Sequence, residues 1–160
     1  MYNRNHSISA VKQAIKSLNT GDTTEVSEFI SSRYFNHESQ MDPARSKIRG
    51  PQEFIDTVVK LRNAISDLHY EIIEIISSNE KVLAIVSVTG KHTGSFFDFI
   101  PPSGNRISFQ AVHIFTIGDD SKIIEHRAIR DDLALMYQLG VVKSTEPQYD
   151  EFLISWKGAK

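Results

Sequence analysis

The chain has 160 residues, a net charge of −2, 40% hydrophobic residues, 24% charged residues and no cysteine. This length suits one domain with a substantial core, and no block of like charge provides the basic footprint of a nucleic-acid-binding protein. The lack of cysteine excludes disulfides, thiolate catalysis and cysteine-ligated zinc.

The sequence predicts no membrane-spanning segment and no signal segment. No apolar run approaches the roughly 20 residues that span a bilayer, and the first residues, MYNRNHSISAVKQ, contain no apolar signal segment. We therefore expect a soluble, cytoplasmic protein with no membrane and no nucleic acid among its partners.

The first third of the chain predicts three helices. Apolar residues recur at three- and four-residue steps over residues 8–18, over a short segment near residues 26–30, and over residues 54–65. Pro51 suits the first turn of the third helix, where no backbone N–H is required.

The remainder of the chain predicts strands. Runs rich in Val, Ile and Thr cover residues 69–77, 81–93 and 107–117, and a fourth strand from residue 123 leads into a helix that Gly140 ends. Helices followed by a meander of strands predict an α+β fold, a curved antiparallel sheet with helices across its concave side and one pocket between them. Residues 1–140 form the expected domain, and 141–160 an extension that packs on the core or on a dimer partner.

Several short motifs occur in a characteristic order and spacing. They are Asn36-His37, Gly50 to Phe54, Asp67-Leu68, Thr89 to Gly94, Ile100 to Gly104, Lys122 to His126, Asp131 to Leu133, and Gln138 to Gly140. Together they resemble the SnoaL-like family of polyketide and ester cyclases, over roughly Ile8 to Gly140. The resemblance implies the cone-shaped α+β fold of the nuclear transport factor 2-like superfamily, which also contains ketosteroid isomerase. It further implies a homodimer and a small hydrophobic carbonyl compound, closed into a ring by an intramolecular aldol reaction without cofactor or metal.

Asp131 is the residue that the resemblance assigns as catalytic base, because it matches the acid of the family's D-x-L-G segment. Two departures affect the shape of the pocket: Ala134 stands in place of a common Gly, and Arg127 in place of a common Trp. The residues alone leave another role open, because Asp is also a preferred helix N-cap and the helix dipole favours the charged form. We assign Asp132 as the cap or as a surface acid.

His113 is the second catalytic candidate, since an imidazole can donate to an enolate oxygen or carry a proton. A core histidine bound to a backbone carbonyl would fit the same apolar run. Gln110 is a candidate for substrate binding, but it differs from His113 in strand parity, so an unbroken strand directs only one of them to the cavity.

Arg127, His92, His37 and Phe97 complete the predicted substrate-binding set. Arg127 shares strand parity with Asp131, so it can bind substrate or pair with that acid, and the same parity places His126 on the outer face. His92 and His37 lie near the ends of elements, where a surface position is equally ordinary. Phe97 belongs to a Phe-rich segment that fits a lid over the ligand, core packing or a dimer contact.

The histidines do not form a close metal-ligand pair, and we predict no metal site. Two functions of different classes remain, a cofactor-free cyclase and a non-catalytic ligand-binding or dimerisation module, because one fold hosts both. An isomerase or dehydratase would use similar chemistry on another substrate.

Overall fold

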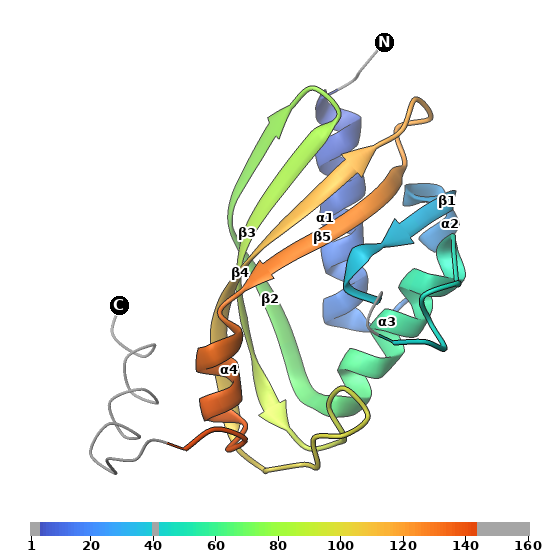
Figure 1. Cartoon of the computed structure of the whole chain (residues 1–160). Coiled ribbons are helices and arrows are strands. Elements are labelled where there is room, and N and C mark those ends of the chain that lie inside the picture. Colours follow the sequence, from blue (N-terminus) through green and yellow to red (C-terminus); the bar gives the residue numbers. More distant parts are fainter. Residues whose placement is uncertain (1–3, 40–41, 144–160) are drawn as a thin grey trace.

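The structure is a computed structural model that describes residues 4–39 and 42–143 (Figure 1). Its elements in chain order are α1 (Arg4–Thr20), α2 (Val26–Phe29), β1 (Ile30–Asn36), the 3-10 turn η1 (His37–Ser39), α3 (Pro51–Ala64), β2 (Ile65–Ser78), β3 (Lys81–His92), β4 (Arg106–Ile117), β5 (Ile123–Arg130) and α4 (Asp132–Gln138). Among these described residues, no helix is long and apolar enough to cross a membrane.

One curved, unclosed sheet organises the fold, with strand order β1-β5-β4-β3-β2 (Figure 1). The predicted α+β class and the antiparallel pairing of β2 to β5 are confirmed. The structure adds an edge strand, β1, which pairs in parallel with β5. The local pattern does not predict β1, because polar residues at 31–33 interrupt its alternation.

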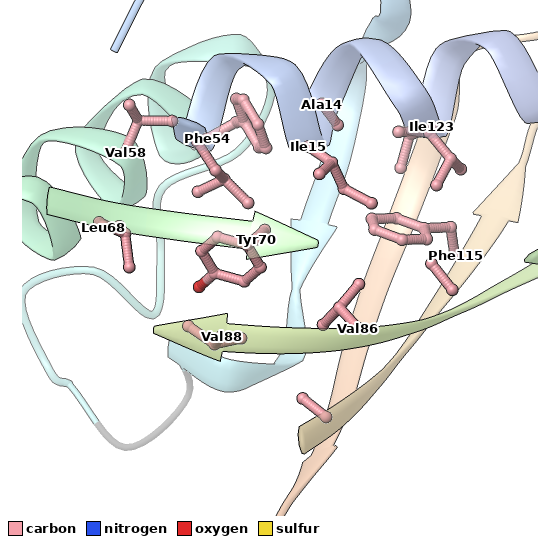
Figure 2. Close-up of a cluster of buried hydrophobic side chains, with 14 of the residues drawn as sticks. Ala14, Ile15, Phe54, Val58, Leu68, Tyr70, Val86, Val88, Phe115 and Ile123 are labelled. Carbon is pink, nitrogen blue, oxygen red and sulfur yellow. The ribbon is translucent and has the colours of Figure 1, made fainter. Parts of the chain in front are cut away.

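The core lies between the concave face of the sheet and the helices α1 and α3. Strand alternation supplies it, because successive side chains of β3 and β4 are buried and half-buried in turn. Figure 2 shows this cluster, with Phe54 and Val58 of α3 at one side and Phe115 of β4 and Ile123 of β5 at the other. Burying side chains of this size stabilises the fold by about 1.5–3 kcal/mol each.

A β-bulge in β5 determines which of its side chains face the core. Ile123 pairs with Ile117, but the next step on β4, Thr116, pairs with Glu125, so Ile124 is an extra residue on β5. A bulge of one residue reverses the faces of all later side chains. From His126 onward, the even-numbered residues of β5 therefore lie on the concave side.

Helix α4 begins directly after β5, and its N-cap is Asp131. The Asp131 carboxylate accepts a hydrogen bond of 3.1 Å from the backbone N–H of Ala134, as an N-cap does. Asp132 is the first helical residue, is exposed and pairs with Arg130, so it is a surface acid and its alternative assignment as the cap is wrong. The predicted extension from residue 144 lies outside the described residues.

Candidate functional site

A cavity of about 1020 Å³ lies between the concave face of the sheet and the helices. Most of its wall is apolar and aromatic. Its polar groups include Asn36, His37, Glu38, His113, His126 and Arg130. A large apolar cavity with a few convergent polar groups is typical of a small-molecule site.

Two histidines meet inside this cavity. His113 of β4 and His126 of β5 stack with ring centroids 5.0 Å apart, and Nδ1 of His113 lies 2.8 Å from Nε2 of His126. Nδ1 of His126 lies 3.0 Å from Oδ1 of Asn36, its register partner on β1. The parallel pairing of β1 with β5 thus positions the amide that holds this histidine pair.

The hydrogen bonds fix which ring nitrogens carry protons. Oδ1 of Asn36 also accepts from the backbone N–H of Glu38 at 3.1 Å, so it is an acceptor and His126 Nδ1–H must donate to it. In neutral His126, Nε2 then carries no proton, and its lone pair accepts a hydrogen bond from His113 Nδ1–H. The basic nitrogen of His113 is therefore Nε2, for which no hydrogen-bond partner occurs within residues 4–39 and 42–143.

Both histidines are neutral near pH 7. Burial, assisted by the positive charge of Arg130, lowers the pKa of His113 to about 4. Burial also holds the pKa of His126 well below its usual value, with His113 and then Arg130 adding to the effect. A neutral imidazole can accept a proton, whereas an imidazolium cannot.

Arg130 supplies the positive charge of the site. Its Nη1 donates to Glu38 at 2.8 Å and its Nε to Asp132 at 3.0 Å, which fixes the guanidinium at the cavity wall. Burial opposes the charge, but the hydrogen bonds and charges of Asp132 and Glu38 outweigh it and raise the pKa of Arg130. Its remaining nitrogen, Nη2, makes no hydrogen bond or ion pair within the described part of the chain, so it is available to a ligand oxygen.

Two tyrosines also line the cavity. The ring of Tyr70 lies 5.8 Å from that of His113, edge to face, and Figure 2 shows Tyr70 on β2 near Leu68 and Val88. Burial raises the pKa of Tyr70 to about 12 and that of Tyr34 well above its usual value. Both phenols therefore keep their protons at neutral pH and can donate a hydrogen bond.

Asp131 directly follows the lining residue Arg130 but is not itself among the described residues that line the cavity. Its side chain is exposed and caps α4. The residues that line the cavity, all within the described ranges, do not include Asp131. Its role as a base stays a prediction from the resemblance.

The other predicted residues divide into two groups. His113, His37 and Phe97 line the cavity, and Phe97 stacks on Phe99 at its rim. His92, Gln110 and Arg127 are absent from the lining within the described ranges.

Each residue of the second group has an ordinary structural position. His92 is fully buried and accepts a hydrogen bond from the backbone N–H of Ser103. Gln110 and Arg127 are exposed, as alternation on β4 and the bulge in β5 require. Their roles in substrate binding stay predictions that this geometry does not support.

Sequence reasoning missed His126 and Arg130 as site residues, and the placement of His126 on the outer face is wrong. That placement assumed that Asp131 faces the pocket and counted parity back from it, whereas the bulge at Ile124 leaves the even-numbered residues His126 and Arg130 on the cavity side. No local signal in the sequence marks the bulge. Within the described ranges, no three His, Asp or Glu side chains converge as metal ligands.

Comparison with known proteins relates the sequence of this chain to a known family. The model of the family described as SnoaL-like polyketide cyclase matches residues 8–139. Aklanonic acid methyl ester cyclase DnrD of Streptomyces peucetius is 34% identical over 135 residues, 83% of this chain and 90% of that protein. Nogalonic acid methyl ester cyclase of Streptomyces nogalater is 30% identical over 127 residues, 79% of this chain and 91% of that protein.

A solved structure supports the same fold. TsrD from Streptomyces laurentii superposes with a TM-score of 0.77 at 22% identity, covering 89% of this chain and all of that one. At this identity the likeness concerns the fold, whereas the family match covers most of the sequence. The chain belongs to the SnoaL-like polyketide cyclase family.

Proposed function

We propose that this protein closes a ring in the methyl ester of a polyketide acid by an intramolecular aldol reaction, without cofactor or metal. The family and the cyclase names of the relatives support the reaction class. The apolar cavity of about 1020 Å³ supports a substrate of polycyclic size. The observation that carries the proposal is the neutral His113, whose Nε2 lone pair has no partner among the described residues of that cavity.

The reaction begins with a proton transfer. Nε2 of His113 removes a proton from a carbon made acidic by neighbouring carbonyl groups, which leaves an enolate on the substrate. The Tyr70 hydroxyl and Nη2 of Arg130 donate hydrogen bonds to the enolate oxygen. The negative enolate also stabilises the imidazolium formed beside it, which offsets the low proton affinity of the buried ring.

Ring closure follows within the same molecule. The enolate carbon attacks a second carbonyl carbon, a C–C bond forms, and the carbonyl oxygen becomes an alkoxide. His113 returns its proton to this alkoxide and is neutral again. The product is an isomer of the substrate, so no atoms or electrons are gained or lost.

Asp131 is the rival base. The resemblance supports it, whereas its exposed position at the cap of α4 supports a structural role. Assigning the base to His113 or to Asp131 makes opposite predictions for the rates of two variants in which an amide replaces the candidate base.

The test compares His113→Gln with Asp131→Asn on a polyketide methyl ester substrate. Removing a general base costs roughly 10²- to 10⁴-fold in rate, so we expect kcat of His113→Gln to fall by at least about a hundredfold. Asn is an equally good N-cap, so Asp131→Asn keeps α4 intact and we expect a rate within about threefold of the native one. Ring closure is measured by chromatography, as the conversion of the substrate into a product of the same mass.

The opposite outcome identifies Asp131 as the base. If Asp131→Asn loses the activity while His113→Gln retains it, the assignment of His113 is wrong. Tight binding of the compound without turnover by the native protein would instead support the non-catalytic binding module.

We also propose that the protein is a cytoplasmic homodimer. The outer face of the sheet carries an apolar patch of adjacent side chains, and the family resemblance implies pairing with a second copy. The patch consists of Ile76, Leu83, Ile85, Val112, Ile114 and Ile129.

A further inference from the structure

Glu53 is a buried carboxylate that the proposed reaction does not use directly. It lies in the first turn of α3 and is 1% exposed. Its Oε1 accepts from Arg45 Nη2 at 2.6 Å, from Thr57 Oγ1 at 3.4 Å and from the Ser39 hydroxyl. Burying a carboxylate costs free energy unless it is paired, and Arg45 supplies the pairing charge.

The same oxygen reaches the histidine pair through one amide. Nδ2 of Asn36 donates to Glu53 Oε1 at 3.3 Å, and Oδ1 of Asn36 accepts from His126 Nδ1 at 3.0 Å. His126 in turn contacts His113 at 2.8 Å. A continuous chain of hydrogen bonds therefore runs from Glu53 to the ring of His113.

We infer that Glu53 is a positioning residue that sets the tautomer of both histidines and so makes Nε2 the basic nitrogen of His113. Because Oε1 accepts from a guanidinium, it can only accept from Asn36, and the Asn36 amide must direct its NH2 group to Glu53. Its oxygen then faces His126. The consequence for catalysis rests on the proposed function, whereas the tautomers themselves do not.

If the Asn36 amide were turned around, the donor and acceptor roles of both histidines would be reversed. If Asn36 presented its NH2 group to His126, Nδ1 of His126 would become an acceptor and Nε2–H a donor to His113 Nδ1. Nε2 of His113 would then carry the proton and could not act as a base. The Glu38 N–H also opposes this reversal, but it belongs to the main chain, so Glu53 is the side chain through which the orientation can be tested.

The first experiment measures the tautomers in the native protein without any substrate. Long-range ¹H–¹⁵N NMR of protein labelled at histidine distinguishes Nδ1–H from Nε2–H rings. We expect His113 and His126 both to be Nδ1–H at about pH 7.5, where both rings are neutral. A native His113 with its proton on Nε2 overturns the inference.

The second experiment interrupts the chain of hydrogen bonds at two places, with one variant for each place. Arg45→Met/Glu53→Met removes the carboxylate together with its charge partner, and Asn36→Leu removes the amide, so one variant serves if the other does not fold. In both we expect a population of Nε2–H tautomers and a fall in kcat of about 10- to 100-fold, by analogy with groups that orient metal-binding histidines through the other ring nitrogen. Native tautomers in a folded variant of either kind overturn the inference.

Two matched variants separate positioning from stability. Glu53→Gln keeps the acceptor at Oε1 and places its NH2 group at the position of Oε2, which has no partner among the described residues. We expect it to retain the native tautomers. Val58→Ala opens a cavity in the same helix outside the hydrogen-bond chain, and it should lower stability but leave the tautomers native.

The readouts also separate this inference from the proposed function. Altered tautomers with an unchanged rate would contradict His113 as the base and support the role of Glu53 in positioning. Native tautomers in Arg45→Met/Glu53→Met and Asn36→Leu, together with an inactive His113→Gln, would support His113 as the base. They would overturn the positioning role of Glu53.

Discussion

At the scale of single residues, the site depends on groups whose charge the fold suppresses. His113 and His126 lie in a low-dielectric wall beside Arg130, so both remain neutral, and Tyr70 remains protonated. The same burial that prepares His113 to accept a proton also makes its protonation costly to the folded state. The chemistry and the acid stability of the protein are therefore linked.

We expect stability to decline as pH falls from about 6.5 to about 4. The pKa of His113 is about 4 in the folded state and roughly 6.5 in the unfolded chain, so between these values the unfolded state binds the extra proton. The free energy of unfolding should fall by on the order of 3 kcal/mol over this range through His113 alone. Urea unfolding at several pH values measures it.

The control for this titration is His113→Gln, which has no ring to protonate. Its stability should depend less steeply on pH between about 6.5 and about 4 than that of the native protein. Equal slopes in the two proteins would show that His113 is not held neutral by burial.

At the scale of elements, the junction of β5 and α4 separates two neighbouring acids. Asp131 caps α4 and Asp132 holds Arg130 at the cavity wall. The bulge in β5 directs His126 and Arg130 to the cavity, and the parallel strand β1 brings Asn36 beside His126. The end of β5 and the start of α4 therefore both begin the helix and position polar side chains at the cavity wall.

We expect Asp131→Ala to lower the free energy of unfolding by about 1 kcal/mol, because the N–H of Ala134 loses its side-chain acceptor. Asp131→Asn should remain within a few tenths of a kcal/mol of the native value, since Asn caps equally well. Thermal and urea unfolding compare the three proteins. If Asn destabilises as much as Ala, the charge of Asp131 matters more than its hydrogen bond.

At the scale of the whole molecule, the two faces of the sheet have different tasks. The concave face and the helices line the cavity, while the outer face presents the apolar patch defined above. Ile129, at its β5 edge, is 66% exposed and extends this contiguous apolar patch, and a contiguous patch is a candidate interaction surface.

We expect Ile129→Glu to convert a dimer into a monomer, because a carboxylate buried in an apolar interface is desolvated without a partner. Analytical ultracentrifugation gives the mass in solution. Val59→Glu is the control, since Val59 is half exposed on α3, in the helical layer. A native protein that sediments as a monomer would contradict the homodimer.

Local periodicity and motif spacing are enough to derive the order of helices and strands apart from β1, the alternation that fills the core, and the family. They are also enough to predict His113, His37 and Phe97 as residues of the cavity. The long-range pairing of strands was needed to show that His126 and Arg130 join them and that Asn36 connects Glu53 to the histidine pair. Pairing across strands sets the register, and one extra residue at Ile124 reverses the faces of β5 without any mark in the local sequence.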